Sequence, residues 1–364
     1  MPIQGLEAKF KQMGEVLDGV KNIVVLCHDN PDPDALASML GLRYLFTSHF
    51  RIKTRLAYGG EIGRAENQAM VRLLKIPVGN IEDLRLRKGT RFALVDTQPQ
   101  FQNNSLPEGA NVLVVFDHHP PPKKVMSPFY HVIRDLGATS TLIYNYISHA
   151  GLELDNRLAT AFTYALISET QDLGREASQD DIMVYQELIP KTSLRTLSNI
   201  RFPLLPHDYF RTLNRALNNT FYYKNIVVTR LGKVESADMI HQMADLLLRF
   251  ERRSWSLCIG RTDDYVLLSL RSSNVRARCG KMIARLVRGK GHAGGHDMVA
   301  GGRIRINSPN DSELQRIEEL IITRLLKYMG HPGDSNIMVP LVGLDEEDGG
   351  RRLNPTPQTG GKDG

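Results

Sequence analysis

Metal-ligating side chains follow three apolar runs in the N-terminal part of the chain. They are His28, Asp32 and Asp34 after residues 23–27, Asp96 after residues 92–95, and Asp117, His118 and His119 after residues 112–116. Short apolar runs rich in β-branched residues predict buried parallel strands, and in open α/β sheets the active site lies just past the carboxyl ends of such strands. Imidazole combined with several carboxylates suits Mn²⁺, Fe²⁺, Co²⁺ or Zn²⁺, and the number of carboxylates favours the harder ions.

The number of carboxylates has a chemical consequence. Carboxylates packed together repel one another and do not all ionise without a counter-charge. Two divalent cations would neutralise them, and a pair of ions roughly 3.5–4 Å apart binds the attacking and leaving oxygens of a phosphoryl transfer. Any one of these residues could instead be structural, since an Asp after a strand is often a helix N-cap; Asp34 could be both cap and ligand. The whole set favours a two-metal site.

The elements that must position these residues alternate between strands and helices. The patterns predict strands over residues 23–27, 52–58, 91–95, 112–116 and 130–134, and helices over residues 6–20, 34–49, 64–74, 139–150 and 155–168. The alternation restarts with strands over residues 226–231, 255–260, 265–270 and 302–306, and helices over residues 236–250, 275–288 and 311–328. We therefore predict the α/β class, with a parallel-sheet N-terminal domain joined by a helical linker to a smaller α/β C-terminal domain.

Composition and element pattern predict where the domains begin and end, and composition narrows the range of functions. We predict a catalytic domain at residues 1–190, a linker at 191–225, a second domain at 226–330 and a flexible tail at 331–364, which is rich in Gly, Pro and charge. The net charge of +6 fits an anionic substrate. The three cysteines form no CxxC pair, so neither a disulfide framework nor a thiol nucleophile is indicated. With no leader segment and no apolar run of about 18 residues, we expect a cytoplasmic protein without a membrane partner.

Five segments together resemble the DHH phosphoesterase superfamily. Residues 28–34 (His-Asp-Asn-Pro-Asp-Pro-Asp) are similar to its first motif, Asp96 to its second, Asp117-His118-His119 to the triplet that names the family, residues 165–172 to its fourth, and residues 294–302 to the glycine-histidine motif of the DHH-associated C-terminal domain. The resemblance covers residues 20–328 in the right order. It departs from the family at Glu169, where many members carry Asp, so Asp172 stays open as an alternative ligand.

Chemistry and the resemblance together imply roles for these residues. His28 and Asp32 would share one cation, Asp34 and His118 would ligate a second, and Asp96 would bridge the two. Glu169, or else Asp172, would complete the second ion's shell. Asp117 would hold a histidine tautomer, and His119 would contact the scissile phosphate. The implied cofactors are two divalent metal ions, with Mn²⁺ as the first choice.

The second domain should supply the substrate-binding residues and close over the substrate, with the active site in the interdomain cleft. Arg271 and Ser272, at the end of a predicted strand, could bind a phosphate, because Arg pairs with phosphate bidentately. Gly294 and Gly295 let backbone N–H groups approach a phosphate, and His296 can hydrogen-bond it. Taken alone, the glycine cluster also fits a simple tight turn.

The resemblance implies hydrolysis of phosphate esters of short nucleotides, namely short oligoribonucleotides and linear or cyclic dinucleotides. The glycine-histidine motif argues against pyrophosphatases, which have a different second domain. A 3′-phosphoadenosine 5′-phosphate phosphatase and a non-catalytic nucleotide-binding regulator on the same scaffold remain alternatives. We expect no stable complex with long nucleic acids, and the oligomeric state is left open, with a homodimer among the options.

Overall fold

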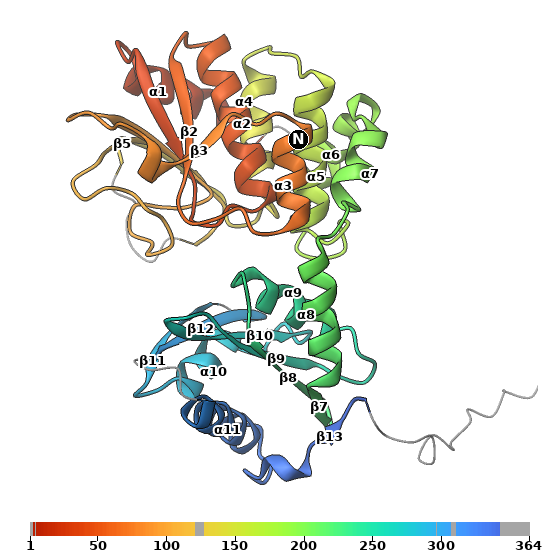
Figure 1. Ribbon diagram of the computed structural model, residues 1–364. Helices are drawn as coiled ribbons and strands as arrows, with labels where there is room; N and C mark the ends of the chain where they lie inside the picture. The colour runs from red at the N-terminus through yellow and green to blue at the C-terminus, as the bar shows by residue number, and fades with distance from the viewer. Residues whose placement is uncertain (1–2, 4, 121–126, 296, 307–310, 343–364) are drawn as a thin grey trace, which may run out of the picture. The chain divides into compact units, whose positions relative to one another are not determined.

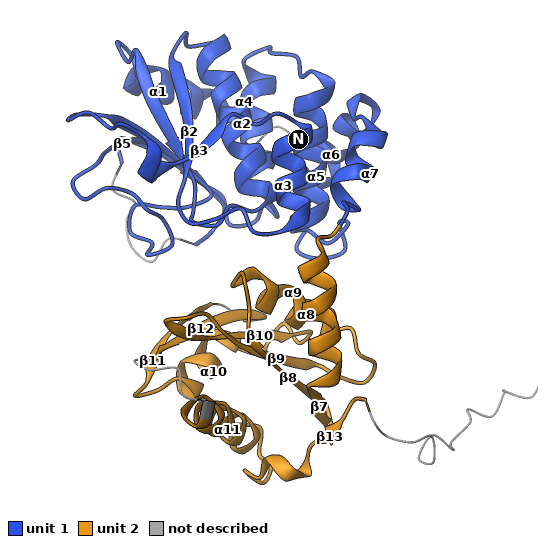
Figure 2. Cartoon of the chain, viewed as in Figure 1, with its two compact units in different colours: residues 1–204 blue, residues 205–364 orange. Residues whose placement is uncertain are grey.

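The computed structural model describes residues 3, 5–120, 127–295, 297–306 and 311–342. The chain divides into two compact units, residues 1–204 and residues 205–364 (Figure 2). Each unit contains its own β-sheet, and the predicted α/β class is confirmed. Among the described helices, none combines the length and the hydrophobicity that a membrane span requires.

Unit 1 is built on a six-stranded sheet in which every strand pairing is parallel, as the apolar runs predict (Figure 1). The strands are β1 (Asn22–Leu26), β2 (Lys53–Tyr58), β3 (Val78–Asn80), β4 (Arg91–Val95), β5 (Asn111–Asp117) and β6 (Phe129–Val132). Their order is β3-β2-β1-β4-β5-β6. The strands that precede the metal-ligating residues, β1, β4 and β5, are therefore neighbours, and their carboxyl ends share one sheet edge.

The two faces of this sheet are covered differently. The helices of unit 1 are α1 (Leu6–Leu17), α2 (Pro33–Ser48), α3 (Ala65–Leu73), η1 (Ile81–Asp83), α4 (Thr139–His149), α5 (Asn156–Glu169), α6 (Gln179–Leu188), η2 (Ile189–Lys191) and α7 (Leu194–Arg201). Val25 and Val114 belong to the core that contains the helices, whereas Val24 and Val115 pack with Ile81 and loop residues on the other face. Successive strand residues thus serve opposite faces, and both faces are apolar.

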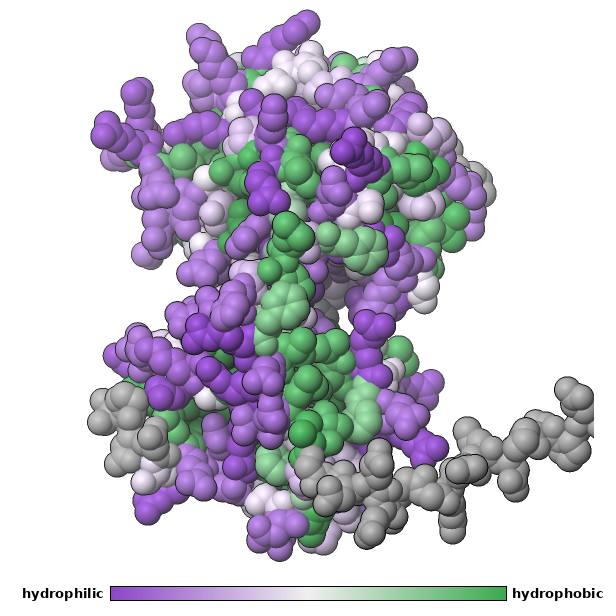
Figure 3. All heavy atoms as spheres, turned by 45° about the vertical axis from the view of Figure 1, so that its right-hand side comes forward, coloured by the Kyte–Doolittle hydropathy of each residue, from purple (hydrophilic) through white to green (hydrophobic). Residues whose placement is uncertain are grey.

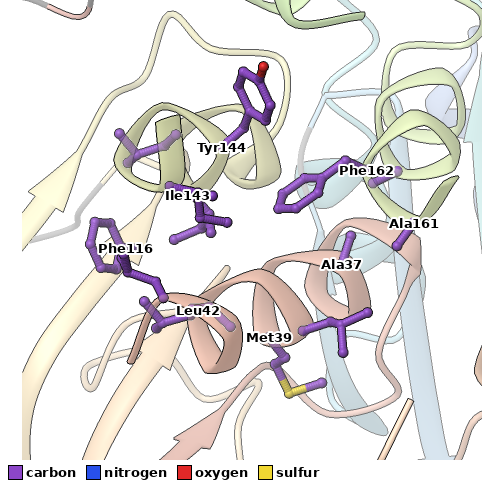
Figure 4. Packing of buried hydrophobic residues seen from close by; sticks show 14 of the residues in the cluster. Ala37, Met39, Leu42, Phe116, Ile143, Tyr144, Ala161 and Phe162 are labelled. Carbon is purple, nitrogen blue, oxygen red and sulfur yellow. The ribbon is translucent and has the colours of Figure 1, made fainter. Parts of the chain in front are cut away.

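The core between α2, α4, α5 and β5 is closely packed (Figure 4). Ala37, Met39 and Leu42 of α2 belong to one buried cluster with Phe116, Ile143 and Phe162. Gly41 is required at the α2–α5 contact, because a Cβ there would lie 2.4 Å from Cζ of Phe162. This packing fixes α2, which follows the first motif, against the helix that ends at Glu169.

Unit 2 contains a seven-stranded mixed sheet with helices on both faces (Figure 1). Its strands are β7 (Thr220–Tyr223), β8 (Ile226–Lys233), β9 (Trp255–Arg261), β10 (Tyr265–Ser272), β11 (Gly291–Gly295), β12 (Val299–Arg305) and β13 (Val339–Pro340). Its helices are α8 (His207–Asn218), α9 (Asp238–Leu247), α10 (Cys279–Leu286), α11 (Asp311–Tyr328) and η3 (Ser335–Ile337). Residues of α8 and α9 pack on one face and residues of α10 and α11 on the other.

Two segments of unit 2 correct the sequence-based expectations. Residues 291–295, expected as a loop or tight turn, form strand β11 at the edge of the sheet, paired with β12. The absence of a Cβ allows this pairing, since a Cβ at Gly291 would lie 2.1 Å from the carbonyl oxygen of Arg303. Residues 335–340, assigned to a flexible tail, instead form η3 and β13, which pairs with β7. Residues 343–364 lie outside the described part of the chain.

The predicted linker, residues 191–225, spans the division between the units at residues 204 and 205. Its helix α7 buries Leu197 and Ile200 in unit 1, and its helix α8 buries Ala216 in unit 2. Figure 3 shows hydrophobic residues at the surface of both units. The exposed hydrophobic side chains in the residues before and after the division include Leu194, Phe202, Leu204 and Phe210. The predicted linker is therefore made mostly of elements that belong to one unit or the other.

Candidate metal centre

Asp96 lies at the centre of the predicted site. It directly follows β4 in a left-handed conformation with φ 56°, which Asp tolerates better than most residues. Its N–H donates to the carbonyl of Phe116 at 2.9 Å. Its carboxylate is only 2% exposed. Its Oδ2 lies 3.5 Å from Nε2 of His28, and its Oδ1 lies 3.7 Å from Nε2 of His118. The ends of β1 and β5 thus bring His28 and His118 to opposite oxygens of the carboxylate that follows β4.

Backbone carbonyls orient both histidine rings. Nδ1 of His28 lies 2.9 Å from the carbonyl oxygen of Asp29, and Nδ1 of His118 lies 3.0 Å from that of Leu136. A carbonyl only accepts hydrogen bonds, so each Nδ1 carries the proton. In the neutral rings, Nε2 then presents a lone pair toward Asp96, which is the usual arrangement of a histidine that ligates a metal.

The two predicted carboxylate ligands of the first motif, Asp32 and Asp34, have different positions. Asp32, not Asp34, is the N-cap of α2, because its Oδ1 accepts from the N–H of Ala35 at 2.9 Å. Its Oδ2 lies 3.5 Å from Nε2 of His28. Asp34 is buried and accepts from the N–H groups of Thr139 and Ser140 at 2.7 and 2.9 Å. The expectation of Asp34 as the cap of α2 is therefore wrong, since Asp34 instead binds the N-terminus of α4, where an anion is favoured.

The segment that begins α4 was missed by the sequence analysis. Thr139 is fully buried, and its hydroxyl donates to Oδ1 of Asp96 at 2.9 Å. Asp181 in α6 supports this segment by accepting from the N–H of Gly137 at 2.7 Å and from the hydroxyl of Thr141. The available signal was the Thr-Ser-Thr run at a predicted helix start, which is also common in ordinary caps.

Asp117 is fully buried and is a hydrogen-bond acceptor for the histidine pair. Its Oδ1 accepts from the N–H of His118 at 2.8 Å and from that of His119 at 3.1 Å. Nδ1 of His119 lies 2.8 Å from the same oxygen. Asp117 therefore orients the His119 ring. The sequence predicts that this carboxylate holds the tautomer of a histidine, and the histidine is His119.

Mutual repulsion and burial dominate the electrostatics of the carboxylates. Burial, with the charges of Asp96, Glu169 and Asp32, raises the pKa of Asp34 well above its usual value. Burial, with Asp32 and Asp96, raises the pKa of Glu169 to about 8. Both groups therefore favour protonation unless positive charge is supplied. Bound cations would reverse these shifts, because positive charge stabilises ionised carboxylates.

The pKa values of His28 and His119 are also raised, whereas the pKa of Asp96 is lowered. Burial disfavours a charged His28 ring, but the carboxylates of Asp32 and Asp96 outweigh it and raise the pKa of His28 well above its usual value. Burial is likewise outweighed at His119, where Asp117 and Asp96 raise the pKa to about 9. Burial also opposes ionisation of Asp96, but the neighbouring histidines lower its pKa. In the absence of metal, the histidines thus supply the positive charge around Asp96.

The structure separates the two alternatives at the fourth motif. Glu169 is the last residue of α5 and is half-buried, and its charge acts on Asp34 and His119. Asp172 is exposed and forms an ion pair with Arg201 at 2.9 Å. The geometry therefore favours Glu169 over Asp172, although its role as a ligand stays a prediction.

The donor set fits divalent cations. Two groups of three side chains, His28 with Asp32 and Asp96, and Asp96 with His118 and His119, each bring one ligand atom within 4.8 Å of the others. The distances of 3.5–3.7 Å between Nε2 and the carboxylate oxygens of Asp96 exceed the usual hydrogen-bond range of about 2.7–3.2 Å. Such a set of imidazoles and carboxylates, sharing one aspartate, suits two ions of the Mn²⁺ type.

The predicted substrate-binding residues of unit 2 differ from one another in burial and in hydrogen bonding. Arg271 is buried and donates from Nε to Asp245 at 2.6 Å. The hydroxyl of Ser272 donates to the carbonyl of Ser254 at 2.9 Å. Gly294 and Gly295 are exposed on the edge strand β11, and His296 lies outside the described residues. Substrate binding by these residues stays a prediction. For Arg271 and Ser272 it competes with their hydrogen bonds to Asp245 and to the carbonyl of Ser254.

Similar proteins were found by sequence and by structure. Over 315 residues, the chain is 30% identical to the uncharacterized protein MJ1633 of Methanocaldococcus jannaschii, covering 85% of this chain and 64% of that protein. Over 170 residues it is 27% identical to a probable manganese-dependent inorganic pyrophosphatase of Lactobacillus helveticus, covering 43% of this chain and 50% of that protein. The chain thus spans less than two thirds of the length of either relative.

One solved structure supports the fold. It is an exopolyphosphatase-related protein from Bacteroides fragilis, with a TM-score of 0.71 and 15% sequence identity, covering 86% of this chain and 96% of that chain. Family models match in two places: the DHH family, N-terminal domain, at residues 22–166, and the DHHA1 domain at residues 223–325. With both domains in the order that the motifs indicated, the chain belongs to the DHH phosphoesterase superfamily.

Proposed function

We propose that the chain is a metal-dependent phosphoester hydrolase that acts on short nucleotides. The observation that carries this proposal is the arrangement around Asp96, whose two oxygens face Nε2 of His28 and Nε2 of His118. The DHH family match and the named activity of the manganese-dependent relatives support a hydrolytic function.

Six residues would hold two divalent cations, with Mn²⁺ as the first choice. Asp96 would be shared, His28 and Asp32 would belong to one ion, and the other ion would take the remaining ligands, which are Asp34, His118 and Glu169. When bound, the cations would polarise the phosphoryl oxygens and lower the pKa of a nucleophilic water. No Ser, Cys or Lys nucleophile is then needed.

The other residues of the site act on the phosphoryl group and its orientation. His119 donates Nδ1–H to Asp117, and the resemblance implies that its ring contacts the scissile phosphate. In the absence of metal, Asp117 and Asp96 outweigh burial and raise the pKa of His119 to about 9. In the metal-loaded site, the proposed role of the ring is to donate a hydrogen bond to a phosphoryl oxygen and stabilise the negative charge that develops there.

The nucleotide preference is supported by the second domain. Strand β11 lies at the edge of the unit 2 sheet, so N–H groups on its outer side have no strand partner among the described residues. Its exposed glycines allow an anion close to those N–H groups. Pyrophosphate is the second candidate substrate, because probable pyrophosphatases are among the relatives; the DHHA1 match favours the nucleotide substrate instead.

A substrate panel tests the proposal. Purified protein with Mn²⁺ is assayed against 5′-phosphorylated oligonucleotides of two to about twenty residues, a cyclic dinucleotide, 3′-phosphoadenosine 5′-phosphate and pyrophosphate. We expect the shortest oligonucleotides to be hydrolysed fastest, and all activity to disappear on chelation and return with Mn²⁺.

Each contrary result of the panel has a definite meaning. Equal rates across the length series, or internal cleavage, would indicate a general nuclease. A preference for pyrophosphate would replace the nucleotide substrate. Binding of nucleotides without turnover, with both metals present, would support a regulatory protein.

A further inference from the structure

Gln98 is a fully buried polar residue two positions after Asp96 that the motifs do not include. Its Nε2 donates to Oδ2 of Asp117 at 2.7 Å and to the backbone carbonyl of His119 at 2.9 Å. Both partners only accept hydrogen bonds, so the amide orientation is fixed: the reversed amide would place its oxygen against two acceptors. Its Oε1 has no hydrogen-bond partner among the described residues, so the side chain is held through its donors alone.

The backbone around Gln98 is also held by side chains. Nδ2 of Asn104 donates to the Gln98 carbonyl at 3.0 Å and to the hydroxyl of Thr97 at 3.0 Å. The carbonyl of Asn103 accepts from the N–H of Asp29 at 2.6 Å. The segment after β4 is thereby tied to the loop that orients His28, and Gln98 extends from it to the histidine pair.

We propose that Gln98 is a positioning residue of the hydrolytic site, an inference that rests on the proposed function. Asp117 accepts His119 Nδ1 on one carboxylate oxygen and Gln98 on the other. Gln98 also holds the His119 backbone. The amide therefore fixes both ends of the Asp117–His119 pair, so that the His119 ring is held in one orientation. Hydrogen-bond partners of metal-ligating histidines typically change metal affinity or activity by about 10–100-fold when they are removed, and we expect a loss of the same order for the partner of Asp117 and His119.

Gln98→Met tests the inference, because methionine has a similar length and no donor. We expect kcat to fall about 10–100-fold, with KM and the bound metal content unchanged. Gln102→Met is the matched control, since Gln102 is an exposed glutamine in the same loop, and it should behave as the wild type. Gln98→Glu keeps the shape of the side chain, serves as the second variant should Gln98→Met not fold, and is expected to lose at least as much kcat.

A double-mutant cycle with Asp117→Asn tests whether Gln98 acts through Asp117. If it does, the double variant Gln98→Met/Asp117→Asn has the kcat of Asp117→Asn within about twofold, because the two residues belong to one chain of hydrogen bonds. Losses that multiply would overturn the inference. So would wild-type kcat in Gln98→Met, or a fall in metal content and Tm that accounts for the whole loss.

A spectroscopic readout separates this inference from the proposed function. In ¹⁵N-labelled protein loaded with diamagnetic Mg²⁺, the hydrogen-bonded Nδ1–H of His119 should give a slowly exchanging, downfield proton signal. We expect the signal to be broadened by exchange in Gln98→Met and retained in Gln102→Met. This result would stand even if the substrate panel failed, whereas an unchanged signal in Gln98→Met would overturn the positioning role whatever the substrate.

Discussion

The two units use their polar residues in opposite ways. In unit 1 the chemical side chains converge on Asp96, and backbone groups hold them there: carbonyls orient His28 and His118, and N–H groups bind Asp34 and Asp117. In unit 2 the strongest candidate, Arg271, is already neutralised by Asp245, and the glycines lie on an exposed edge strand. The first arrangement is held by these hydrogen bonds without any ligand, whereas the second offers mainly backbone groups.

The difference shows that motifs predict a site best when its residues follow adjacent parallel strands. Residues at the ends of adjacent parallel strands must meet, because the sheet leaves them one shared edge. A charged residue at the end of an antiparallel strand has no such constraint and can pair with any neighbouring helix, as Arg271 does with α9. Four experiments test this contrast, beginning with the largest expected effect.

Loss of the shared carboxylate should have the largest effect. Asp96→Asn keeps the shape, and Asn tolerates the left-handed backbone of this position. We expect kcat to fall at least about a thousandfold, or about 4 kcal/mol, and metal content to fall with it. Asp172→Asn is the matched control, because Asp172 is also left-handed but exposed. Wild-type turnover in Asp96→Asn would refute the assignment of the site to this sheet edge.

Substitutions at the fourth motif should have the next largest effect. Glu169→Ala should be severely impaired, by about 100-fold or more in kcat, because it removes a predicted ligand. Glu169→Asp should stay active, and Asp172→Ala should lose much less, since Asp172 pairs with Arg201 on the surface. Activity and metal content of the three variants are compared side by side. The reverse ranking would make Asp172 the ligand.

The scaffold of unit 1 should respond to acid through His131 on β6. Burial, with the charge of Lys9, lowers the pKa of His131 to about 4, so the folded protein binds this proton less readily than the unfolded chain. Its contribution to stability is full above about pH 6.5 and is lost as the pH falls toward 4, costing about 2 kcal/mol between pH 7 and pH 5.

His131→Gln is the control for the acid response, because glutamine does not titrate and can still hydrogen-bond Tyr146, the partner of His131 at 2.8 Å. Urea unfolding at pH 7 and pH 5 should show a smaller loss of stability in this variant. Equal losses in both proteins would mean that His131 does not contribute.

The ion pair of unit 2 should give the smallest effect. Arg271→Ala should lower the free energy of unfolding by about 1–2 kcal/mol, less than the about 3–5 kcal/mol of a fully buried pair, because Asp245 is 41% exposed. Asp245→Ala should lower Tm as well, because it leaves the buried Arg271 without this carboxylate. A tenfold rise in KM for Arg271→Ala that Asp245→Ala does not share would support the substrate role of Arg271 and reduce the contrast between the units.

The sequence by itself determined the α/β class, the parallel sheet and the clustering of the metal-ligating residues. Three apolar runs, each followed by Asp or His, were sufficient because parallel strands place their carboxyl ends together. The glycines of residues 291–295 misled the prediction, since a strand made of glycines has no side-chain alternation to reveal it. The same composition-based reasoning assigned η3 and β13 to a tail.

The tertiary structure alone decided how the site is held. That Asp34 binds the N-terminus of α4, that Thr139 reaches Asp96, and that Gln98 connects Asp117 to His119 all depend on contacts between residues far apart in the chain or in separate loops. Ser, Thr, Gln and backbone groups have no spacing rule that marks such contacts in a sequence. The physical reason is that the ligands follow from strand direction, whereas their hydrogen-bond partners follow from how helices and loops pack against the sheet edge.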